Sequence, residues 1–303
     1  MKKTYTIPVL ALLVLLPSLL SAQRIRDRWK GYRAEVIFSL GASNFLGELG
    51  GANQIGTNYF KDLEFSQTRP AIGIGMRYRL SPLFAITSQI THGQVRGDDA
   101  LTEEFFRNYR NLSFKSNITE FTNNLEFSFL REQAGHRYRL RGVKGLRGFE
   151  MAAYGFVGAG LFKFNPKAEL NGEWYELQPL GTEGQGVLPT RKKYSRIQFV
   201  VPVGIGFKYT FNRRLGIGLE MGLRKTFTDY VDDVSTTYYD NGIIAENNGY
   251  IAALLADRSN QEYPRITVAG QQRGDPTDKD SYMFVMLNAS FKLRTSRVAY
   301  PLF

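Results

Sequence analysis

Hydrophobic and polar positions alternate with a period of two along two adjacent segments, 194–211 and 214–229. One face of each segment is apolar, whereas the other carries glycines and charged residues, and a short polar link at Asn212-Arg213 joins them. A period of two predicts β-strands, and strands this long with one apolar face need a large apolar partner. A lipid bilayer supplies that partner when the other face points into a closed barrel.

Eight segments carry this pattern, and the connections between them alternate in length. The predicted strands are 34–46, 68–80, 83–95, 112–130, 150–165, 194–211, 214–229 and 281–294. The first, third, fifth and seventh connections are long, whereas the others are tight turns except for the link 131–149. Bacterial barrels have an even strand number, short periplasmic turns and long outer loops. We therefore predict an all-β fold, an eight-stranded antiparallel up-and-down transmembrane β-barrel with long extracellular loops.

The fourth predicted strand is less regular than the others. Its apolar residues from Phe121 to Phe129 share one parity, but Phe114 and Ile118 fall on the other. An extra residue in one strand of a pair shifts the parity of the side chains that follow it. We therefore expect a β-bulge near Glu120.

The N-terminus has the features of an export signal. Lys2 and Lys3 precede an apolar run from 7 to 20, which ends in the small residues Ser21-Ala22. This order predicts a signal peptide over 1–22, with an uncleaved signal anchor as the alternative. The expected mature chain has a basic periplasmic arm (23–33), the barrel (34–294) and a periplasmic tail (295–303). We expect it in the outer membrane of a Gram-negative, Bacteroidetes-type cell, with both termini periplasmic.

The composition excludes several kinds of site. The 303 residues include no cysteine and two histidines, which excludes disulfides and zinc–thiolate sites and argues against a multi-histidine metal centre. We therefore expect no cofactor and no bound metal. The net charge of +11 would suit nucleic acid in a cytoplasmic protein, but the export signal argues against that partner. No pattern indicates a small-molecule substrate.

Basic residues concentrate on the predicted periplasmic side, whereas the last outer loop is acidic. The link 131–149 holds the predicted partner-binding surface: Arg131, Arg137, Arg139, Arg141, Lys144 and Arg147. A positive surface attracts either an acidic protein or anionic lipid headgroups. Both readings stay open, with outer-membrane lipids as the second partner, although the length of the link favours protein docking.

Charged residues also lie on the predicted inner faces of the strands, among them Arg77, Glu126, Glu220 and Arg224. Eight strands leave an interior that side chains fill. Buried charges must pair or be hydrated, so we interpret these residues as an internal ion-pair and water network. An ion pathway is the alternative.

Two outer-loop segments are too specific in composition for simple spacers. Their candidate residues are Gly181, Thr182, Glu183, Gly184, Gln185, Asp229, Tyr230, Asp232 and Asp233. The glycines between 181 and 186 permit positive φ angles and tight folding. The aspartates at 229, 232 and 233 suggest either a calcium site or turn caps that pair with loop arginines.

Catalytic patterns are weak in this sequence. His92 near Asp98 and Asp99 is the one combination that suggests hydrolytic chemistry, and no serine-centred motif accompanies it. A histidine at the rim of a barrel is more often an interfacial polar residue. We therefore expect a protein that is not an enzyme.

The loop motifs resemble those of the PorG-like outer-membrane family of the Bacteroidetes type IX secretion system. The resemblance rests on N-F-L-G-E-L-G-G (44–51), G-T-E-G-Q-G (181–186), T-D-Y-V-D-D-V-S (228–235) and R-G (273–274). The first motif departs from the family at Phe45 and Glu48, where Tyr and Asp are usual. The resemblance implies a non-enzymatic barrel that anchors the periplasmic ring of the export complex. It implies as partners the ring lipoprotein (PorK/GldK-like) and its associated protein (PorN/GldN-like). An adhesin or ligand-binding barrel and a small channel are the rival interpretations.

Overall fold

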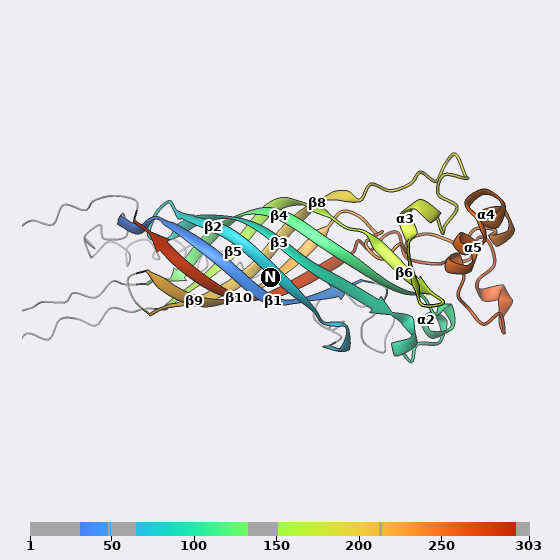
Figure 1. Ribbon diagram of the computed structural model, residues 1–303, viewed down its shortest axis with the longest axis horizontal. Coiled ribbons are helices and arrows are strands. Elements are labelled where there is room, and N and C mark those ends of the chain that lie inside the picture. The colour runs from blue at the N-terminus through green and yellow to red at the C-terminus, as the bar shows by residue number, and fades with distance from the viewer. Residues whose placement is uncertain (1–30, 48, 50–64, 133–150, 212–213, 295–303) are drawn as a thin grey trace, which may run out of the picture.

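The computed structural model describes residues 31–47, 49, 65–132, 151–211 and 214–294, and these include eight long strands that close into a barrel (Figure 1). The barrel strands are β1 (Ala34–Leu46), β2 (Arg69–Arg79), β3 (Phe84–Asp98), β4 (Ser113–Leu130), β5 (Met151–Lys163), β8 (Ile197–Thr210), β9 (Leu215–Thr226) and β10 (Ser281–Leu293). All neighbours are antiparallel, β1 pairs with β10, and the remaining gap is closed by pairing of β3 with β4. The predicted eight-stranded up-and-down barrel is confirmed.

The two ends of the barrel differ in their connections, as the alternating link lengths predict. At one end, here called the turn end, tight links join β2 to β3 and β8 to β9. The opposite end, here called the loop end, carries the helices labelled α2, α3, α4 and α5 in Figure 1. Its elements are η4 (Phe65–Gln67), η5 (Asp99–Leu101), α2 (Phe105–Arg110), β6 (Pro166–Leu170), β7 (Glu173–Glu176), α3 (Leu177–Leu180), α4 (Asn241–Asn248), α5 (Tyr250–Ala256) and η6 (Pro264–Ile266).

One loop contains strands that the sequence pattern did not separate from the connection 166–193. β6 and β7 form a hairpin, and β6 continues the sheet by pairing with the loop-end part of β4 at Lys115↔Lys167. The inner face of this hairpin packs Ala168 against Leu177 and Leu255 of the loop-end helices. The hairpin therefore lengthens the barrel wall on one side.

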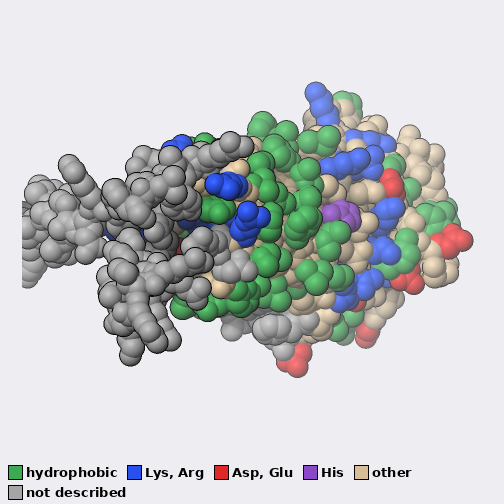
Figure 2. Space-filling view, turned by 60° about the vertical axis from the view of Figure 1, so that its left-hand side comes forward, with side chains coloured by type: hydrophobic (Ala, Val, Ile, Leu, Met, Phe, Trp, Pro, Cys, Tyr) green, Lys and Arg blue, Asp and Glu red, His purple; other side chains and the backbone are tan. Residues whose placement is uncertain are grey.

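Large apolar side chains cover the outside of the turn-end half of the barrel. This hydrophobic belt includes Phe38, Leu40, Ile72, Ile74, Met76, Ile86, Ile90, Phe121, Leu125, Phe127, Val157, Leu161, Phe199, Val203, Ile205, Phe207, Ile217, Leu219 and Leu287. Figure 2 shows the belt as a continuous apolar zone, with Lys and Arg side chains gathered beside it on the loop-end side. Among the described residues, no helix has the length and apolar run needed to cross a membrane.

The interior changes character along the barrel axis. Charged side chains fill the turn-end half, including Glu35, Arg77 and Lys208, all of which are buried. Toward the loop end the interior holds an apolar cluster that includes Phe45, Val95, Phe114, Ile118, Phe162, Phe164, Tyr282, Phe284 and Met286. The outer wall at that level carries polar residues such as Gln94 and Asn117, whose side chains hydrogen-bond to each other.

The expectation of a bulge near Glu120 is wrong. The pairing of β4 with β3 is unbroken from Ser113 to Phe127, and the register with β5 shifts only between Ser128 and Leu130. Phe114 and Ile118 keep the inward parity of Glu120 and are buried in the interior cluster. What changes along β4 is therefore the face that is apolar: the inner face in the loop-end half and the outer face in the turn-end half.

Candidate functional site

The loop motifs meet in one buried group of residues at the loop end. This loop-motif cluster consists of residues 181–186, which follow α3, residues 228–235, which follow β9, and Arg273. Gly181, Gly184 and Gly186 have φ angles of 60°, 78° and 83°, as the glycine pattern predicts. These positive φ angles turn the chain tightly enough to place the Glu183 side chain inside the cluster, where its exposed fraction is 0%.

Glu183 lies at the centre of the cluster and accepts hydrogen bonds from the segment after β9. One carboxylate oxygen accepts from the backbone N–H groups of Ser235 (2.9 Å) and Thr236 (3.2 Å). The other accepts from the Thr236 hydroxyl at 2.7 Å. A buried carboxylate with several donors fixes the position of the groups that donate to it. Glu183 thus connects the two motifs directly.

Arg273 supplies the countercharge of Glu183. Its guanidinium lies 3.0 Å from the Glu183 carboxylate and donates to the backbone carbonyl of Asp233 at 2.6 Å. It also donates to the carbonyl of Ala256 at the end of α5, at 3.3 Å. Burial acts to lower the pKa of Arg273, but the charges of Glu183, Asp233 and Tyr238 and the hydrogen bond to Glu183 raise it. The charge on this arginine is therefore a fixed part of the cluster.

Asp233 completes the contact between the motifs. Its carboxylate accepts hydrogen bonds from the hydroxyls of Thr182 (2.5 Å) and Tyr194 (2.6 Å), and its φ angle of 67° is left-handed. Burial raises the pKa of Asp233 to about 6, although Arg273 and the two hydroxyls act in the opposite direction. Asp233 is therefore the residue of the cluster whose charge changes near neutral pH.

The three loop aspartates do not converge on one point. Asp232 accepts a hydrogen bond from the backbone N–H of Val234 at 2.9 Å, which is a turn-capping contact. Asp229 and Asp232 are both buried. Within the described residues, no group of three acidic or histidine side chains is arranged to hold a metal ion. The Asp232 contact is the kind that the turn-capping alternative predicts.

A second buried ion pair fixes the cluster to the loop between β3 and β4. Arg110 at the end of α2 pairs with Asp99 through two contacts of 2.8 and 3.0 Å, and donates to the backbone carbonyl of Arg273 at 2.5 Å. No sequence motif includes Arg110. A single arginine in a short polar loop carries no pattern that distinguishes it from a solvated residue, so its role depends on tertiary structure.

His92 and the acidic pair after it lie in different environments. His92 is on the outer wall of β3, where Nδ1 is 2.8 Å from the Thr119 hydroxyl. Asp98 caps η5 by accepting from the backbone N–H of Ala100, and Asp99 is buried against Arg110. The structure does not bring these three residues together into a catalytic arrangement.

The interior charges of the turn-end half form one connected layer. Arg77 contacts Glu126 at 2.8 Å, Glu35 at 3.4 Å and the Tyr154 hydroxyl at 2.9 Å, and that hydroxyl donates to Glu220 at 3.0 Å. Further ion pairs extend this layer toward the turn end: Arg79–Glu35, Lys208–Glu35, Arg79–Glu132 and Lys292–Glu132. Buried charges in contact with opposite charges and hydroxyls can stay ionised without bulk water.

A second interior layer lies between these charges and the apolar cluster. Arg224 pairs with Glu120 at 3.1 Å, and Glu120 also accepts from the Tyr282 hydroxyl at 2.9 Å. The Arg224 guanidinium lies 4.8 Å from the centre of the Phe284 ring, which belongs to the apolar cluster. The predicted interior residues Arg77, Glu126, Glu220 and Arg224 thus all lie inside the barrel, in layers that close its lumen.

The described residues include only part of the predicted partner-binding surface. Arg131 directly follows β4 at the turn end. Arg137, Arg139, Arg141, Lys144 and Arg147 lie outside the described residues. Glu132, next to Arg131, belongs to the interior charge layer, and its ion pairs with Lys292 and Arg79 lower its pKa to about 2 in spite of burial. The start of the link is therefore fixed to the barrel interior.

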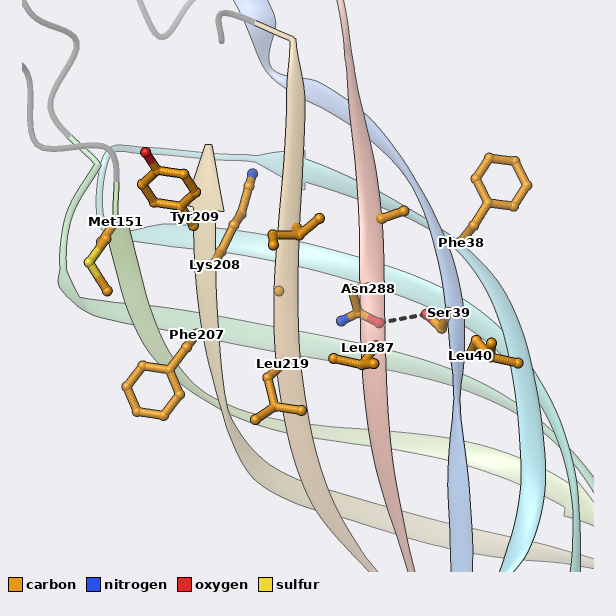
Figure 3. A pocket seen from close by; sticks show the side chains of 13 residues that line it. Phe38, Ser39, Leu40, Met151, Phe207, Lys208, Tyr209, Leu219, Leu287 and Asn288 are labelled. Atoms are coloured by element: carbon orange, nitrogen blue, oxygen red, sulfur yellow. Dashed lines mark hydrogen bonds between the residues drawn. The ribbon is translucent and has the colours of Figure 1, made fainter. Parts of the chain in front are cut away.

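The outer wall carries one shallow apolar concavity of about 590 Å³ within the hydrophobic belt (Figure 3). Phe38 and Leu40 of β1, Phe207 of β8, Leu219 of β9 and Leu287 of β10 surround it. Its lining also includes the small residues Gly218 and Ala289. Its lining is that of the belt, and we assign it no separate role.

Several solved structures are similar to this chain at low sequence identity. Neisserial surface protein A (NspA) matches with a TM-score of 0.37 and 8% identity over 87% of this chain and 97% of its own. Ail, the attachment invasion locus protein of Yersinia pestis, in complex with the heparin analogue sucrose octasulfate, matches at 0.36 and 10% over 86% and 99%. The outer membrane protein OprG from Pseudomonas aeruginosa matches at 0.34 and 8% over 87% and 98%.

The sequence comparisons place the chain in a family. No curated protein matches it significantly. A family model described as a domain of unknown function, DUF6089, matches residues 12–176, which is more than half of the chain. The matched region contains the first four barrel strands, β5 and the β6–β7 hairpin. The chain, an eight-stranded antiparallel up-and-down β-barrel, therefore belongs to the DUF6089 family.

Proposed function

We propose that this chain is a non-enzymatic outer-membrane β-barrel subunit of a protein secretion complex, in which it anchors a periplasmic ring to the membrane. The observation that carries this proposal is the closed interior. Two layers of ion pairs and an apolar cluster fill the lumen. A barrel filled in this way suits an anchor better than a conduit for solutes.

The orientation follows from the two ends and the belt. Outer-membrane barrels have short turns in the periplasm and long loops outside, with an outward apolar band between them. The turn end of this chain therefore faces the periplasm, and the loop end faces the exterior. The chain segments at residues 31 and 294 then both lie on the periplasmic side, within reach of periplasmic proteins.

The type IX assignment rests on the resemblance of the loop motifs to the PorG-like family. The geometry supports treating these motifs together, because Arg273 contacts both Glu183 and the Asp233 carbonyl, and each of the three residues comes from a different motif. The expected partners are a ring lipoprotein of the PorK/GldK kind and its PorN/GldN-like associate. The basic link 131–149 is the candidate surface for them.

Affinity purification of the tagged, full-length protein from detergent-extracted outer membranes tests this proposal. We expect the wild-type protein to retain periplasmic ring components. The variant Arg137→Glu/Arg139→Glu/Arg141→Glu should lose them, since it reverses the charge of the link. A matched control, Lys192→Glu/Lys193→Glu/Arg265→Glu, reverses three charges at the loop end and should retain them. Equal recovery of ring components with both variants would exclude the link as the docking surface, and no ring component with the wild type would contradict the proposal.

Surface binding is the second candidate function, and an exposed aromatic group at the loop end favours it. Phe105 and Phe106 of α2 and Tyr263 before η6 have exposed fractions of 52%, 62% and 49%, and Phe105 packs against Tyr263 with ring centres 5.8 Å apart. Exposed aromatic groups mark binding surfaces more often than scattered apolar residues do. Loss of cell or matrix attachment in Phe105→Ser/Phe106→Ser, with ring components retained in the pull-down, would favour this function.

A further inference from the structure

Three cations lie side by side on the outer wall of the barrel beyond the hydrophobic belt. Arg96 of β3 is paired in register with Lys115 of β4, and Lys115 is paired with Lys167 of β6. Residues paired across neighbouring strands have Cα atoms about 5 Å apart, so like charges at such positions repel. We call these three residues the basic row. The row has its third member because β6 extends the sheet beside β4 and brings Lys167 next to Lys115.

An aromatic ring holds two of these cations in place. The Lys115 amine lies 3.3 Å from the centre of the Trp174 ring, and the Arg96 guanidinium lies 5.5 Å from it. Trp174 comes from β7, and its partner in register is Glu169. Cation–π contacts of this kind fix the side chains against the wall while leaving the charges available to a ligand. Tryptophan is also enriched where barrels meet the polar layer of the membrane.

The carboxylates near the basic row are shared with other donors. Glu176 lies 3.1 Å from Lys167, but it also pairs with Arg196 at 3.0 Å and accepts from Asn165 at 2.8 Å. Glu169 attracts Lys115, whereas Arg96 and Lys167 repel it. Asp98 caps η5, and Glu173 accepts from Tyr175. With Lys163 at the end of β5 and Arg196, the described part of this wall has five cations against these four carboxylates, an excess of one positive charge.

The distance of the basic row from the hydrophobic belt determines which anionic groups of the membrane can reach it. Arg96 lies six residues beyond Ile90, the last belt residue of β3. At about 3.3 Å per residue and a tilt of about 40°, that places it roughly 15 Å farther out. The polar layer of a phospholipid bilayer is only about 6 Å thick on each side. A phosphate borne on a saccharide headgroup reaches the level of the row, whereas a phospholipid phosphate lies nearer to Lys163.

We propose that Arg96, Lys115 and Lys167, supported by Trp174, bind the phosphorylated saccharide headgroup of an outer-leaflet lipopolysaccharide. The inference rests on the proposed outer-membrane location but not on any secretion role. Phosphate neutralises the repulsion within the row and accepts charge-assisted hydrogen bonds from Arg96 and the two lysines. The belt below the row provides the apolar wall for the acyl chains of the same molecule. The barrel thereby gains a fixed lipid on the side formed by β3, β4 and β6.

Binding of purified, refolded full-length protein to rough-type lipopolysaccharide in detergent tests the proposal. The variant Arg96→Gln/Lys115→Gln/Lys167→Gln should bind roughly 10- to 100-fold more weakly at about 0.15 M salt, since each cation contributes to attraction of an anionic surface. The control Lys192→Gln/Arg265→Gln/Lys279→Gln removes three loop-end charges away from the row and should bind within about twofold of the wild type. Heat-dependent migration in gels verifies that each variant is a folded barrel.

Three further arms separate the possible sources of the anion. Lipopolysaccharide stripped of its phosphates should bind the wild type as weakly as intact lipopolysaccharide binds the triple variant. Inorganic phosphate at millimolar concentration should not compete. Equal affinity of the wild type and the triple variant for intact lipopolysaccharide would overturn the proposal, as would full competition by inorganic phosphate. Binding of heparin that depends on the row, without lipopolysaccharide binding, would assign the row to a sulfated polysaccharide instead. Because no ring protein takes part in these assays, their failure is distinct from failure of the pull-down.

Discussion

The turn-end and loop-end halves of this barrel use the same strands with opposite chemistry. In the turn-end half the outer face is apolar and the inner face holds ion pairs such as Arg77–Glu126. In the loop-end half the inner face is an apolar cluster and the outer face carries residues such as Gln94 and Asn117. The strand parity continues through the change. In the proposed outer-membrane location, the apolar outer face of the turn-end half meets lipid and the polar outer face of the loop-end half meets water.

The largest effect on this comparison is expected from Glu183→Ala. The substitution leaves the buried Arg273 guanidinium without its countercharge and the N–H groups of Ser235 and Thr236 without their acceptor, which should destabilise the loop end by about 3–5 kcal/mol. We expect faster hydrogen exchange in 228–236 and unchanged exchange in the turn-end half. The exposed Glu173 provides the control Glu173→Ala. Equal exchange in the variant and the wild type would show that the two halves do not depend on this contact.

The second-largest difference between the two halves is expected when a charge is introduced on the outer wall. Leu219→Arg places a cation in the hydrophobic belt and should cost about 2–4 kcal/mol in a bilayer. Gln94→Arg places the same group on the outer wall beyond the belt and should change the free energy of unfolding by about 0.5 kcal/mol or less. Urea unfolding in phospholipid vesicles measures both. Similar costs at the two positions would contradict a boundary between lipid and water on this wall.

The loop end should show a pH dependence of its own. Because burial raises the pKa of Asp233 from 3.8 to about 6, its contribution to stability is fully present below pH 4 and is lost as the pH rises through 6. The whole difference is at most about 3 kcal/mol. A fluorophore on a cysteine introduced at the exposed Tyr250 reports loop-end unfolding in urea, since the chain has no other cysteine. Asp233→Asn should flatten the pH profile, and a wild-type profile that is already flat would refute this assignment.

The smallest predicted effect concerns one hydroxyl. Tyr194→Phe removes the 2.6 Å hydrogen bond to Asp233 and should destabilise the loop end by about 1 kcal/mol. It should also move the pH midpoint of the loop end upward, because the hydroxyl favours the charged carboxylate. Tyr230→Phe, whose hydroxyl is 3.4 Å from Glu183, should have a smaller effect on both measurements. A larger effect from Tyr230→Phe would reverse the order of these contacts.

The barrel could be predicted from the sequence because a strand whose two faces meet different environments alternates in polarity. Each predicted strand has its counterpart, but the pattern of β4 was misread, since the apolar face changes sides where the strand leaves the belt. A change of solvent and a bulge produce the same break in apolar periodicity. Only the pairing register distinguishes them, and the register of β4 is continuous at Glu120.

Part of the candidate site could be predicted from the sequence. Glycine spacing and acidic residues singled out 181–186 and 228–235, because positive φ angles and turn caps have local sequence requirements. The contact between the two motifs could not be predicted, because Glu183 and Ser235 are 52 residues apart and no sequence pattern links them. The same holds for the basic row, whose members become neighbours only through the pairing of β3, β4 and β6.

The loop-motif cluster also indicates the order in which parts of the barrel fold. Arg273 lies just before the last strand, Glu183 is 90 residues earlier, and Arg110 is 163 residues earlier. Contacts so distant in sequence form late, because the chain between them must first be organised. The three segments that meet there follow β3, β5 and β9, so the cluster can form only when most of the barrel exists. A conformation-specific antibody against the assembled loop end would therefore recognise inserted, closed barrels and ignore chains still in assembly.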